Sequence, residues 1–391
     1  MAREAVIVDA VRTPVGRRGG QLRGWHPVDL LAHTVADLVR RSGVDPEAID
    51  DVIAGCVLQH EEQTGNVARN AALGAGLPVS VPGATVDRQC GSGQQAVHFA
   101  AQAVRSGEYD FAIGGGVESM SRVELGPLFT PGAARGPWYG DRAVARFHGD
   151  LPAQGRSAEL VVKRWGFPRE RLDEFSIRSH RRAHAATEAG WFATQLAPLD
   201  GVDADGGALA MTRDEGIRAH LDPDKIASLK PVFAADGVLT AANSSQMSDG
   251  AAALLVADRA RAEAAGLRPR ARIAAMAVAG DDPVLQFTAI VPASRKALDR
   301  AGLSIGDIDL VEVNEAFSPV PLLWREAFGY PEDQLNVNGG SIAIGHPLGS
   351  TGARLLTQLL NELERRQARY GLVTICEGGG MANATIIERL S

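Results

Sequence analysis

Two residues of this chain stand where covalent chemistry could begin. Cys90 lies between an extended run, residues 85–89, and a Gly-Ser-Gly segment typical of a helix start. The unpaired backbone N–H groups of a helix N-terminus favour a thiolate over a thiol. The competing interpretation is a buried structural cysteine, because free cysteines are often buried. Position alone gives the two interpretations equal weight.

His346 is the candidate partner of that thiol. It lies between Gly345 and Pro347, in a glycine-rich loop before a predicted helix at 350–366. Core packing explains such a histidine poorly, whereas an imidazole with an ordinary pKa of about 6.5 can accept a thiol proton. The alternative is a ring that only satisfies hydrogen bonds within the turn. Together, Cys90 and His346 predict nucleophilic catalysis.

Two further polar residues follow predicted strands. Cys376 ends a strand, and the carboxyl ends of parallel strands face the crevice where α/β proteins bind ligands. Asn314 also follows a strand, where its amide could orient a water or a histidine, or simply close a turn. Two cysteines and a histidine could ligate a metal. Their spacing matches no compact zinc pattern, so we expect no metal site.

The elements that must position these residues alternate along the chain. Strand-like runs and helix-like runs, such as 27–42 and 91–105, predict an α/β fold with a parallel sheet. Residues 43–55 recur as 302–314 at a constant offset of 259. A second pair of matching segments has a strand that ends in a glycine cluster, at 114–116 and 378–380. Two matches in one order predict an internal duplication, unless all α/β units simply look alike.

The middle of the chain differs from these repeats. Residues 118–230 are poor in strand signals and contain a clear helix at 168–188. We therefore expect a mostly helical loop domain, inserted into the first of two related halves. The first half is expected to span residues 1–117 and 231–262, and the second residues 263–391.

Composition excludes several classes of function. The 391 residues include 47 acidic and 40 basic side chains, a net charge of −7, which disfavours a nucleic-acid partner. No apolar run is long enough to span a bilayer, so no membrane partner is expected. Three widely spaced cysteines argue against disulfides and favour a cytoplasmic location. Of these three, Cys56 lies in an apolar run and is assigned to the core.

Taken together, the motifs resemble the thiolase family, the acetyl-CoA acyltransferases, over nearly the whole chain. In detail they are most similar to actinobacterial degradative 3-ketoacyl-CoA thiolases. The matching segments, in the family's order, are Cys90–Gly93, Gly114–Ser121, Asn243–Gly250, Asn314–Phe317, Asn336–Gly352 and Cys376–Gly380. The resemblance implies a five-layered α-β-α-β-α sandwich of two similar α/β halves with an inserted loop domain.

The same resemblance implies CoA-dependent cleavage of a 3-ketoacyl-CoA, a reversible Claisen reaction, and residues for each role. Cys90 would carry the acyl group, and His346 would take its proton. Cys376 would exchange a proton with the α-carbon of the acetyl unit. Asn314 would hold a water that forms one oxyanion hole with His346, and the N–H groups of Cys90 and Gly378 would form the second. No cofactor is implied, since CoA and acyl-CoA are substrates.

Substrate binding and assembly are also implied. Ser245 matches the family position that contacts the pantetheine arm of CoA, and Arg218 is a candidate for binding the CoA nucleotide. Family members are dimers or tetramers, so we expect a homodimer or homotetramer.

The chain departs from the family pattern at two places. Residues 147–159 lack the His-Met-Gly segment with which short-chain biosynthetic thiolases restrict the acyl pocket. This favours a bulkier or branched acyl group, as in steroid side-chain degradation. Glu377 replaces a residue that is usually small or apolar; it either raises the pKa of the Cys376 thiol or points away from it.

Other activities remain open. An acetyl-CoA acetyltransferase that forms acetoacetyl-CoA would use the same residues. A Cys-His-Asn hydrolase built from Cys90, His346 and Asn314 would leave Cys376 without a role. Condensing enzymes that act on carrier-protein thioesters usually replace Cys376 by His or Asn. A non-catalytic, thiolase-like lipid carrier would usually lack the nucleophile.

Overall fold

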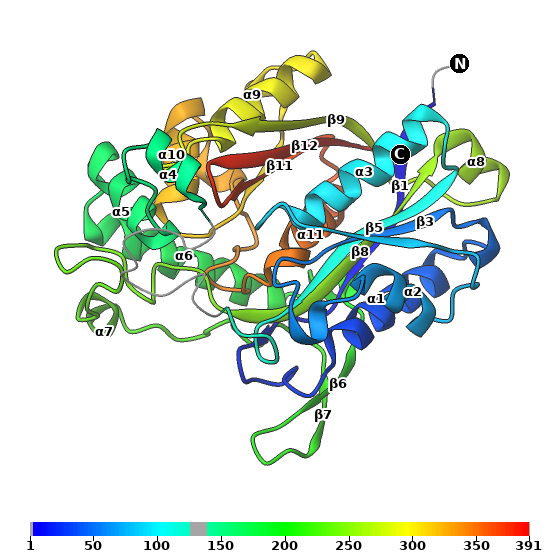
Figure 1. Ribbon diagram of the computed structural model, residues 1–391, viewed down its shortest axis with the longest axis horizontal. Helices are drawn as coiled ribbons and strands as arrows, with labels where there is room; N and C mark the ends of the chain where they lie inside the picture. The colour runs from blue at the N-terminus through cyan, green and yellow to red at the C-terminus, as the bar shows by residue number, and fades with distance from the viewer. Residues whose placement is uncertain (1–2, 126–138, 391) are drawn as a thin grey trace.

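The computed structural model describes residues 3–125 and 139–390, which form a mixed α/β structure (Figure 1). The strands are β1 (Ala5–Arg12), β2 (Gly16–Arg17), β3 (Asp51–Gly55), β4 (Gly83–Val86), β5 (Phe111–Ser119), β6 (Leu199–Val202), β7 (Ala208–Met211), β8 (Ser248–Asp258), β9 (Ala271–Gly280), β10 (Leu310–Val313), β11 (Tyr370–Glu377) and β12 (Met381–Arg389). The helices are α1 (Pro27–Ser42), α2 (Val67–Gly74), α3 (Ser92–Ser106), α4 (Asp141–Arg146), α5 (Gln154–Trp165), α6 (Arg169–Glu188), α7 (Pro223–Ala227), α8 (Arg259–Ala264), α9 (Ile290–Ala301), α10 (Pro319–Phe328) and α11 (Leu348–Arg366). None of the helices in these ranges is long and apolar enough to cross a membrane.

The main sheet contains the same strand arrangement twice. Its order is β10-β11-β12-β9-β1-β8-β5-β3-β4. In one half β3 is parallel to β5, and β8 is antiparallel to both β5 and β1. In the other half β10 is parallel to β11, and β12 is antiparallel to both β11 and β9. Only two residue pairs, Val6–Arg272 and Ile7–Ala271, join the halves between β1 and β9. The sheet is therefore mixed, and the expectation of a purely parallel sheet is wrong.

The corresponding helices end in the same way. Helix α1 stops at Gly43 and α9 at Gly302, each in the left-handed conformation, with φ of 71° and 66°. Glycine adopts this conformation without steric cost, so it ends a helix sharply. In both copies a short 3₁₀ turn and then a strand follow, which is the order of elements in the repeated sequence.

Helices and strands are stacked in layers. Helices α3 and α11 pack on each other and on strands of both halves, and so form the middle layer (Figure 1). Helices α1 and α2 cover the outer face of the first set of strands, and α9 covers that of the second. Apolar clusters fill the spaces on both sides of the strands. The middle layer matters most for function, because the N-termini of α3 and α11 carry candidate residues.

The glycine cluster 114–116 lies inside a strand, although the sequence suggested that it ends one. Strand β5 continues to Ser119. A side chain on Gly114 would meet the backbone of Val97 in α3 at 2.7 Å, so the helix lies directly on the strand. The second cluster, 378–380, forms the turn between β11 and β12.

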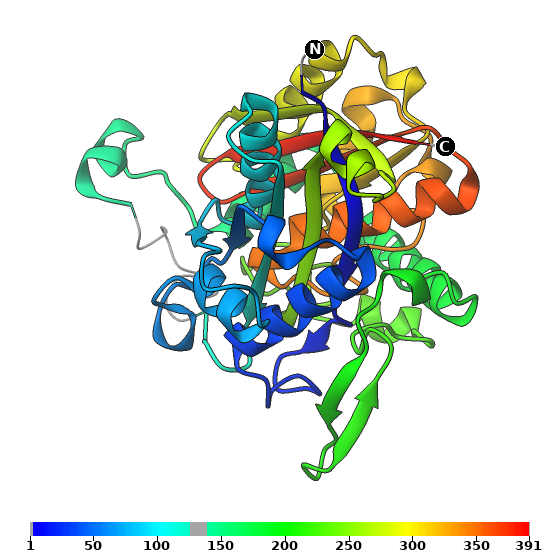
Figure 2. The ribbon, with the colours of Figure 1, turned by 90° about the vertical axis from the view of Figure 1, so that its right-hand side faces the viewer.

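The inserted segment is richer in strands than expected. It contains helices α4 to α7, and also the strands β6 and β7, which pair as an antiparallel ribbon. This ribbon extends away from the body of the protein (Figure 2). Each of its strands has only 4 residues, too few for an alternating pattern to stand out in the sequence.

Candidate active site

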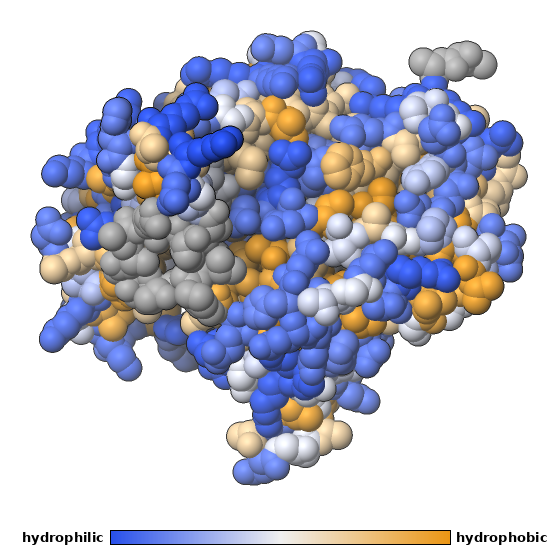
Figure 3. Space-filling model, viewed as in Figure 1, coloured by the Kyte–Doolittle hydropathy of each residue, from blue (hydrophilic) through white to orange (hydrophobic). Residues whose placement is uncertain are grey.

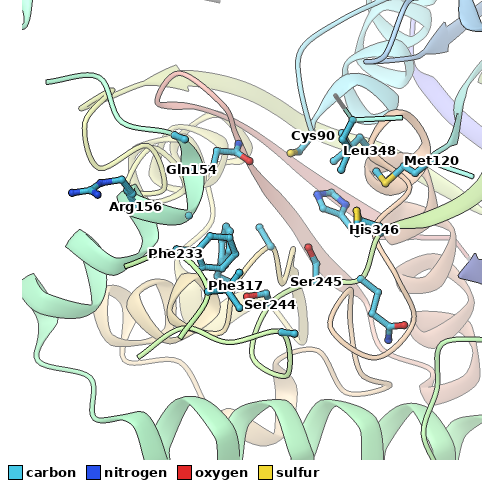
Figure 4. A pocket seen from close by; sticks show the side chains of 18 residues that line it. Cys90, Met120, Gln154, Arg156, Phe233, Ser244, Ser245, Phe317, His346 and Leu348 are labelled. Carbon is cyan, nitrogen blue, oxygen red and sulfur yellow. The ribbon is translucent and has the colours of Figure 1, made fainter. Parts of the chain in front are cut away.

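Cys90 and His346 line one cavity of about 370 Å³, and both side chains lie on its wall (Figure 4). Cys90 lies two residues before the start of α3, and His346 two residues before the start of α11. Apolar side chains form much of the remaining wall: Met120, Leu125, Val232, Phe233, Phe317 and Leu348. The fold therefore brings the predicted nucleophile and base, 256 residues apart, into one water-poor pocket.

Hydrogen bonds fix the protonation state of His346. Its Nδ1 lies 2.7 Å from the hydroxyl oxygen of Thr351, and that hydroxyl donates to the carbonyl oxygen of Pro347 at 2.8 Å. Since the Thr351 proton is already used, Nδ1 must donate, which leaves Nε2 without a proton. Burial, and then the charge of Arg354, lower the pKa of His346 to about 3. The ring is therefore a neutral base.

Asn314 lies directly behind this base. Its side chain is fully buried, and its Nδ2 lies 3.4 Å from Nε2 of His346. Its Oδ1 accepts a hydrogen bond from the hydroxyl of Ser341 at 2.6 Å. That hydroxyl in turn accepts from Arg354, Nη2 to Oγ 2.9 Å. The predicted contact between Asn314 and His346 is thus present.

Cys90 is a neutral thiol rather than a thiolate. Burial raises its pKa to about 12, and the carboxylate of Glu377 contributes in the same direction. A hydrogen bond with Gln154 opposes this shift only in part. Burial thus shifts the pKa of Cys90 in the direction opposite to the one expected from a helix N-terminus. Ionisation of Cys90 therefore needs a base, and His346 lines the same cavity.

Cys376 and its neighbour Glu377 approach Cys90 from β11. Burial raises the pKa of Cys376 well above its ordinary value, followed by the effects of Cys90 and Glu377. The two thiols are therefore close enough to interact. Glu377 is also buried, and a side chain added to Gly91 would lie 1.9 Å from its Oε1. Glu377 thus raises the pKa of both thiols and does not point away.

Gly378, the predicted oxyanion donor, lies beside the same pocket. A side chain built on it would come within 3.0 Å of Gln89 Oε1 and 3.2 Å of Gln154 Nε2. Since Gln154 lines the cavity and bonds to Cys90, the backbone of Gly378 lies near the thiol.

Four glycines bring the supporting elements together. Side chains on Gly55, Gly93 or Gly116 would each lie within 2.6 Å of the carbonyl oxygen of Gly349. A side chain on Gly349 itself would lie 2.3 Å from the carbonyl oxygen of Val117. Such distances are impossible for real side chains, so β3, β5, α3 and α11 touch through their backbones. We call this contact the glycine junction.

Two buried carboxylates brace the loops around the site. Glu118 accepts hydrogen bonds from the backbone N–H groups of Val57, Leu58 and Gly349, and from the side chain of Gln63. Glu315 accepts from Ser179, Asn336 and the backbone of Ile342. Burial raises the pKa of both carboxyl groups. Both residues connect segments that are distant in sequence.

The two residues predicted to bind CoA lie in different hollows. Ser245 lines the main cavity with Cys90. Arg218 is exposed and lines a small hollow of about 20 Å³. The two hollows share Ala241 and Gln246, so Arg218 lies beside the main cavity rather than in it.

Sequence reasoning missed several residues of the site. Ser341, Thr351 and Arg354 lie in the glycine-rich segment that drew attention to His346, but no local pattern indicates which of them face inward. Gln154 belongs to the inserted segment, and nothing in its neighbourhood points to Cys90. Within residues 3–125 and 139–390, no cluster of three His, Cys, Asp or Glu side chains could hold a metal ion.

Comparison with known proteins gives the family. Models described as thiolase, N-terminal domain, and thiolase, C-terminal domain, match residues 5–260 and 267–389. The chain is 47% identical to a steroid 3-ketoacyl-CoA thiolase of Mycobacterium tuberculosis, FadA6, over 99% of this chain and 94% of that protein. It is 46% identical to a 3-ketoacyl-CoA thiolase of Vibrio cholerae, over 98% of this chain and 99% of that protein.

A solved structure confirms the fold. The acetyl-CoA acetyltransferase of Bacillus anthracis superposes with a TM-score of 0.89 at 37% identity, covering 100% of this chain and 99% of that one. The expected thiolase-like architecture is therefore correct. Two family models that together span nearly the whole sequence, and relatives above 40% identity over its full length, establish that the chain belongs to the thiolase family.

Proposed function

We propose that the protein cleaves 3-ketoacyl-CoA with CoA, to give acetyl-CoA and a shortened acyl-CoA. The observation that carries this proposal is the convergence of Cys90, His346, Asn314 and Cys376 on one apolar cavity. Thiol, base, amide and second thiol are the groups that a reversible Claisen reaction through a thioester needs. Relatives along the full length that are named 3-ketoacyl-CoA thiolases support this direction.

The first half-reaction begins with proton transfer. Nε2 of His346 takes the proton of the Cys90 thiol, and the sulfur attacks the ketone carbon of the substrate. The bond between the α- and β-carbons then breaks, which leaves the acyl group on Cys90 and acetyl-CoA as its enolate. Cys376, a thiol with a raised pKa, is suited to deliver the proton that this enolate needs.

Two sets of donors would stabilise the negative oxygens. A water held by Asn314, together with His346, would serve the acetyl-CoA carbonyl oxygen. The N–H groups of Cys90 and Gly378 would serve the thioester on Cys90. A preorganised donor of this kind typically contributes about 3–4 kcal/mol to lowering a barrier. In the second half-reaction CoA takes the acyl group from Cys90, so the kinetics should be ping-pong.

We assign the main cavity to the acyl chain and the pantetheine arm. Its aromatic wall of Phe233 and Phe317 and its volume of about 370 Å³ suit a bulky or branched acyl group. The relative named as a steroid 3-ketoacyl-CoA thiolase points the same way. Ser245 lines this cavity, and the exposed Arg218 beside the cavity is suited to the CoA phosphates.

We infer a multimer in the cytoplasm. Strand β4 lies at an edge of the main sheet, and an unpaired edge is a template for another chain. Near it, Leu73 and Val79 are exposed, and hydrophobic side chains gather on the face that carries α3 (Figure 3). Sedimentation should give a homodimer or homotetramer of the 41.2 kDa chain. A monomer at micromolar concentration would contradict this.

The decisive experiment is acylation in the absence of acceptor. Incubation with acetyl-CoA should add one acetyl group to the intact protein, and peptide mapping should place it on Cys90. The adduct should be absent from Cys90→Ala and should disappear when CoA is added. A folded wild-type protein that forms no adduct would contradict the proposed mechanism.

Substrate choice needs a separate comparison. CoA-dependent cleavage should be measured with acetoacetyl-CoA, a long-chain 3-ketoacyl-CoA and a steroid 3-ketoacyl-CoA. A clear preference for acetoacetyl-CoA would favour the acetyltransferase instead. Hydrolysis of simple thioesters with no dependence on CoA would favour the Cys-His-Asn hydrolase.

A further inference from the structure

The geometry points to Ser341 and Arg354 as positioning residues that hold the Asn314 carboxamide with its N–H group toward Nε2 of His346. This inference rests on the proposed function and adds a device that orients its base and its amide. It follows from two chains of hydrogen bonds, in each of which the donors and acceptors can be assigned in only one way.

The first chain starts at a buried cation. Arg354 is 1% exposed, and a guanidinium can only donate hydrogen bonds. Its Nη2 donates to the Ser341 hydroxyl at 2.9 Å, so the single proton of that hydroxyl is free to go to Asn314 Oδ1, 2.6 Å away. The oxygen end of the amide is thereby fixed on Ser341. The N–H end must face His346.

The second chain starts from the other side of the histidine. The Thr351 hydroxyl donates to the Pro347 carbonyl, so Nδ1 of His346 donates to Thr351 and Nε2 carries a lone pair. At the Asn314–His346 contact, the first chain presents an N–H donor and the second a bare nitrogen. A flipped amide would set an oxygen against that lone pair. It would also leave the Ser341 proton without its acceptor.

The charge of Arg354 gives the first chain a further effect. In the part of the chain that the structure describes, Arg354 forms no ion pair within 4.0 Å, and its Nε has no hydrogen-bond partner. Its remaining side-chain contact is with Gln358, a neutral amide. The positive charge acts directly on His346, whose pKa it lowers, and it also polarises the hydrogen bonds through Ser341, which makes the Asn314 N–H a stronger donor. Burial and then the charge of Arg12 lower the pKa of Arg354, and Glu312, whose own pKa burial raises to about 8, is no permanent counter-charge at neutral pH.

The test removes the Ser341 hydroxyl and keeps Arg354 and Asn314, the two residues that it connects. Ser341→Ala deletes one hydroxyl, and steady-state cleavage should show kcat lower by about five- to twentyfold, with KM for both substrates within about twofold. In an Asn314→Ala background the same substitution should lower kcat by less than about twofold, because Ser341 acts through Asn314. Multiplicative losses in the double variant would overturn the inference, as would full activity of Ser341→Ala.

A matched control separates this effect from simple loss of a buried hydrogen bond. Ser294 is also fully buried, accepts from Trp324 Nε1 and donates to the carbonyl oxygen of Ile290, far from the cavity. Ser294→Ala should keep kcat within twofold. Ser341→Thr keeps the hydroxyl and should retain most of kcat. If the Thr variant loses as much kcat as the Ala variant, or if Ser341→Ala does not fold, Ser341 is a packing residue and the inference is wrong.

Different results decide the proposed function and the positioning role of Ser341. If wild-type protein forms no acetyl adduct on Cys90, the proposed function fails. If wild type acylates and turns over while the Ser341 and Asn314 losses multiply, only the positioning role fails.

Discussion

At the scale of single residues, burial determines the protonation states of both Cys90 and His346, the proposed nucleophile and base. Burial raises the pKa of Cys90 to about 12 and lowers that of His346 to about 3. Each group is therefore held in its uncharged form at neutral pH. The proton is transferred only when an arriving substrate offers a place for the new charge. Such a pair protects the thiol from oxidation and alkylation between turnovers, since the thiolate is the reactive form.

Glu377 offers a direct test of this electrostatic balance. Burial raises the pKa of Glu377 itself well above its ordinary value, and once ionised its carboxylate raises the pKa of Cys90. Glu377→Gln should therefore lower the pKa of Cys90 and increase the thiolate fraction at pH 9. Alkylation of Cys90 by iodoacetamide, followed by peptide mass mapping, should become roughly three- to tenfold faster. Glu312→Gln, a change at another buried carboxyl, should leave the rate unchanged. An equal or slower rate in Glu377→Gln would contradict the assigned role.

Sequence analysis could identify candidates for the reacting residues but not their protonation states. Cys90 and His346 stand in glycine-rich motifs whose residue types already suggest catalysis. The direction of each pKa shift depends on burial and on Glu377, which comes from the other half of the chain. The helix N-terminus before which Cys90 lies was visible in the sequence, whereas the loss of water that raises the pKa of Cys90 was not.

At the scale of elements, the glycine junction sets the spacing of α3 and α11. Because backbone touches backbone there, no side chain can adjust to relieve a clash. The sequence predicted a glycine-rich site but assigned residues 114–116 to the end of a strand. Glycine is common both in turns and where backbones approach closely, and only the neighbouring helices decide between the two.

A single methyl group should therefore disturb the junction. Gly116→Ala places a carbon 2.0 Å from the carbonyl oxygen of Gly349, so β5 and α11 must move apart. We expect a loss of about 2–4 kcal/mol in the free energy of unfolding, and a fall in kcat. Gly140→Ala, where nothing lies within 4 Å, should change stability by less than about 1 kcal/mol. Urea denaturation of both variants checks this, and equal stabilities would argue against the junction.

At the scale of the whole molecule, buried acids make stability depend on pH. Burial raises the pKa of Glu312 to about 8 in the folded protein, against an ordinary value of 4.5. Between these values the folded state keeps a proton that the unfolded state releases. Stability should therefore fall as pH rises from about 5 to 8, and this contribution is complete above the folded pKa.

Glu312→Gln removes this titration. Its free energy of unfolding should fall less between pH 5 and pH 8 than that of wild type, by about 2–4 kcal/mol. Urea denaturation at the two pH values measures the difference. Parallel pH profiles for the two proteins would show that Glu312 is ionised in the fold.

The duplicated architecture was largely predictable, because the repeated segments keep their spacing and their helix-ending glycines. The strand directions were not, since the pairing of β8 with β1 and β5, and of β12 with β9, depends on contacts distant in sequence. The ribbon of β6 and β7 also escaped prediction, because each strand has only 4 residues and β7, an Ala-Leu-Ala-Met run, shows no alternation of polar and apolar residues.

The repeat places the nucleophile and the base at equivalent positions. Cys90 and His346 each lie two residues before the first residue of a central helix, one in each half. Glu118 and Glu377 also correspond, at the offset of 259 that relates the repeated segments, whereas Cys90 and His346 are 256 residues apart. One binds the N-terminus of α11 at Gly349, and the other lies against Gly91 before α3. In the proposed mechanism one duplicated structural position thus serves two different chemical tasks, and each half supplies only part of the site.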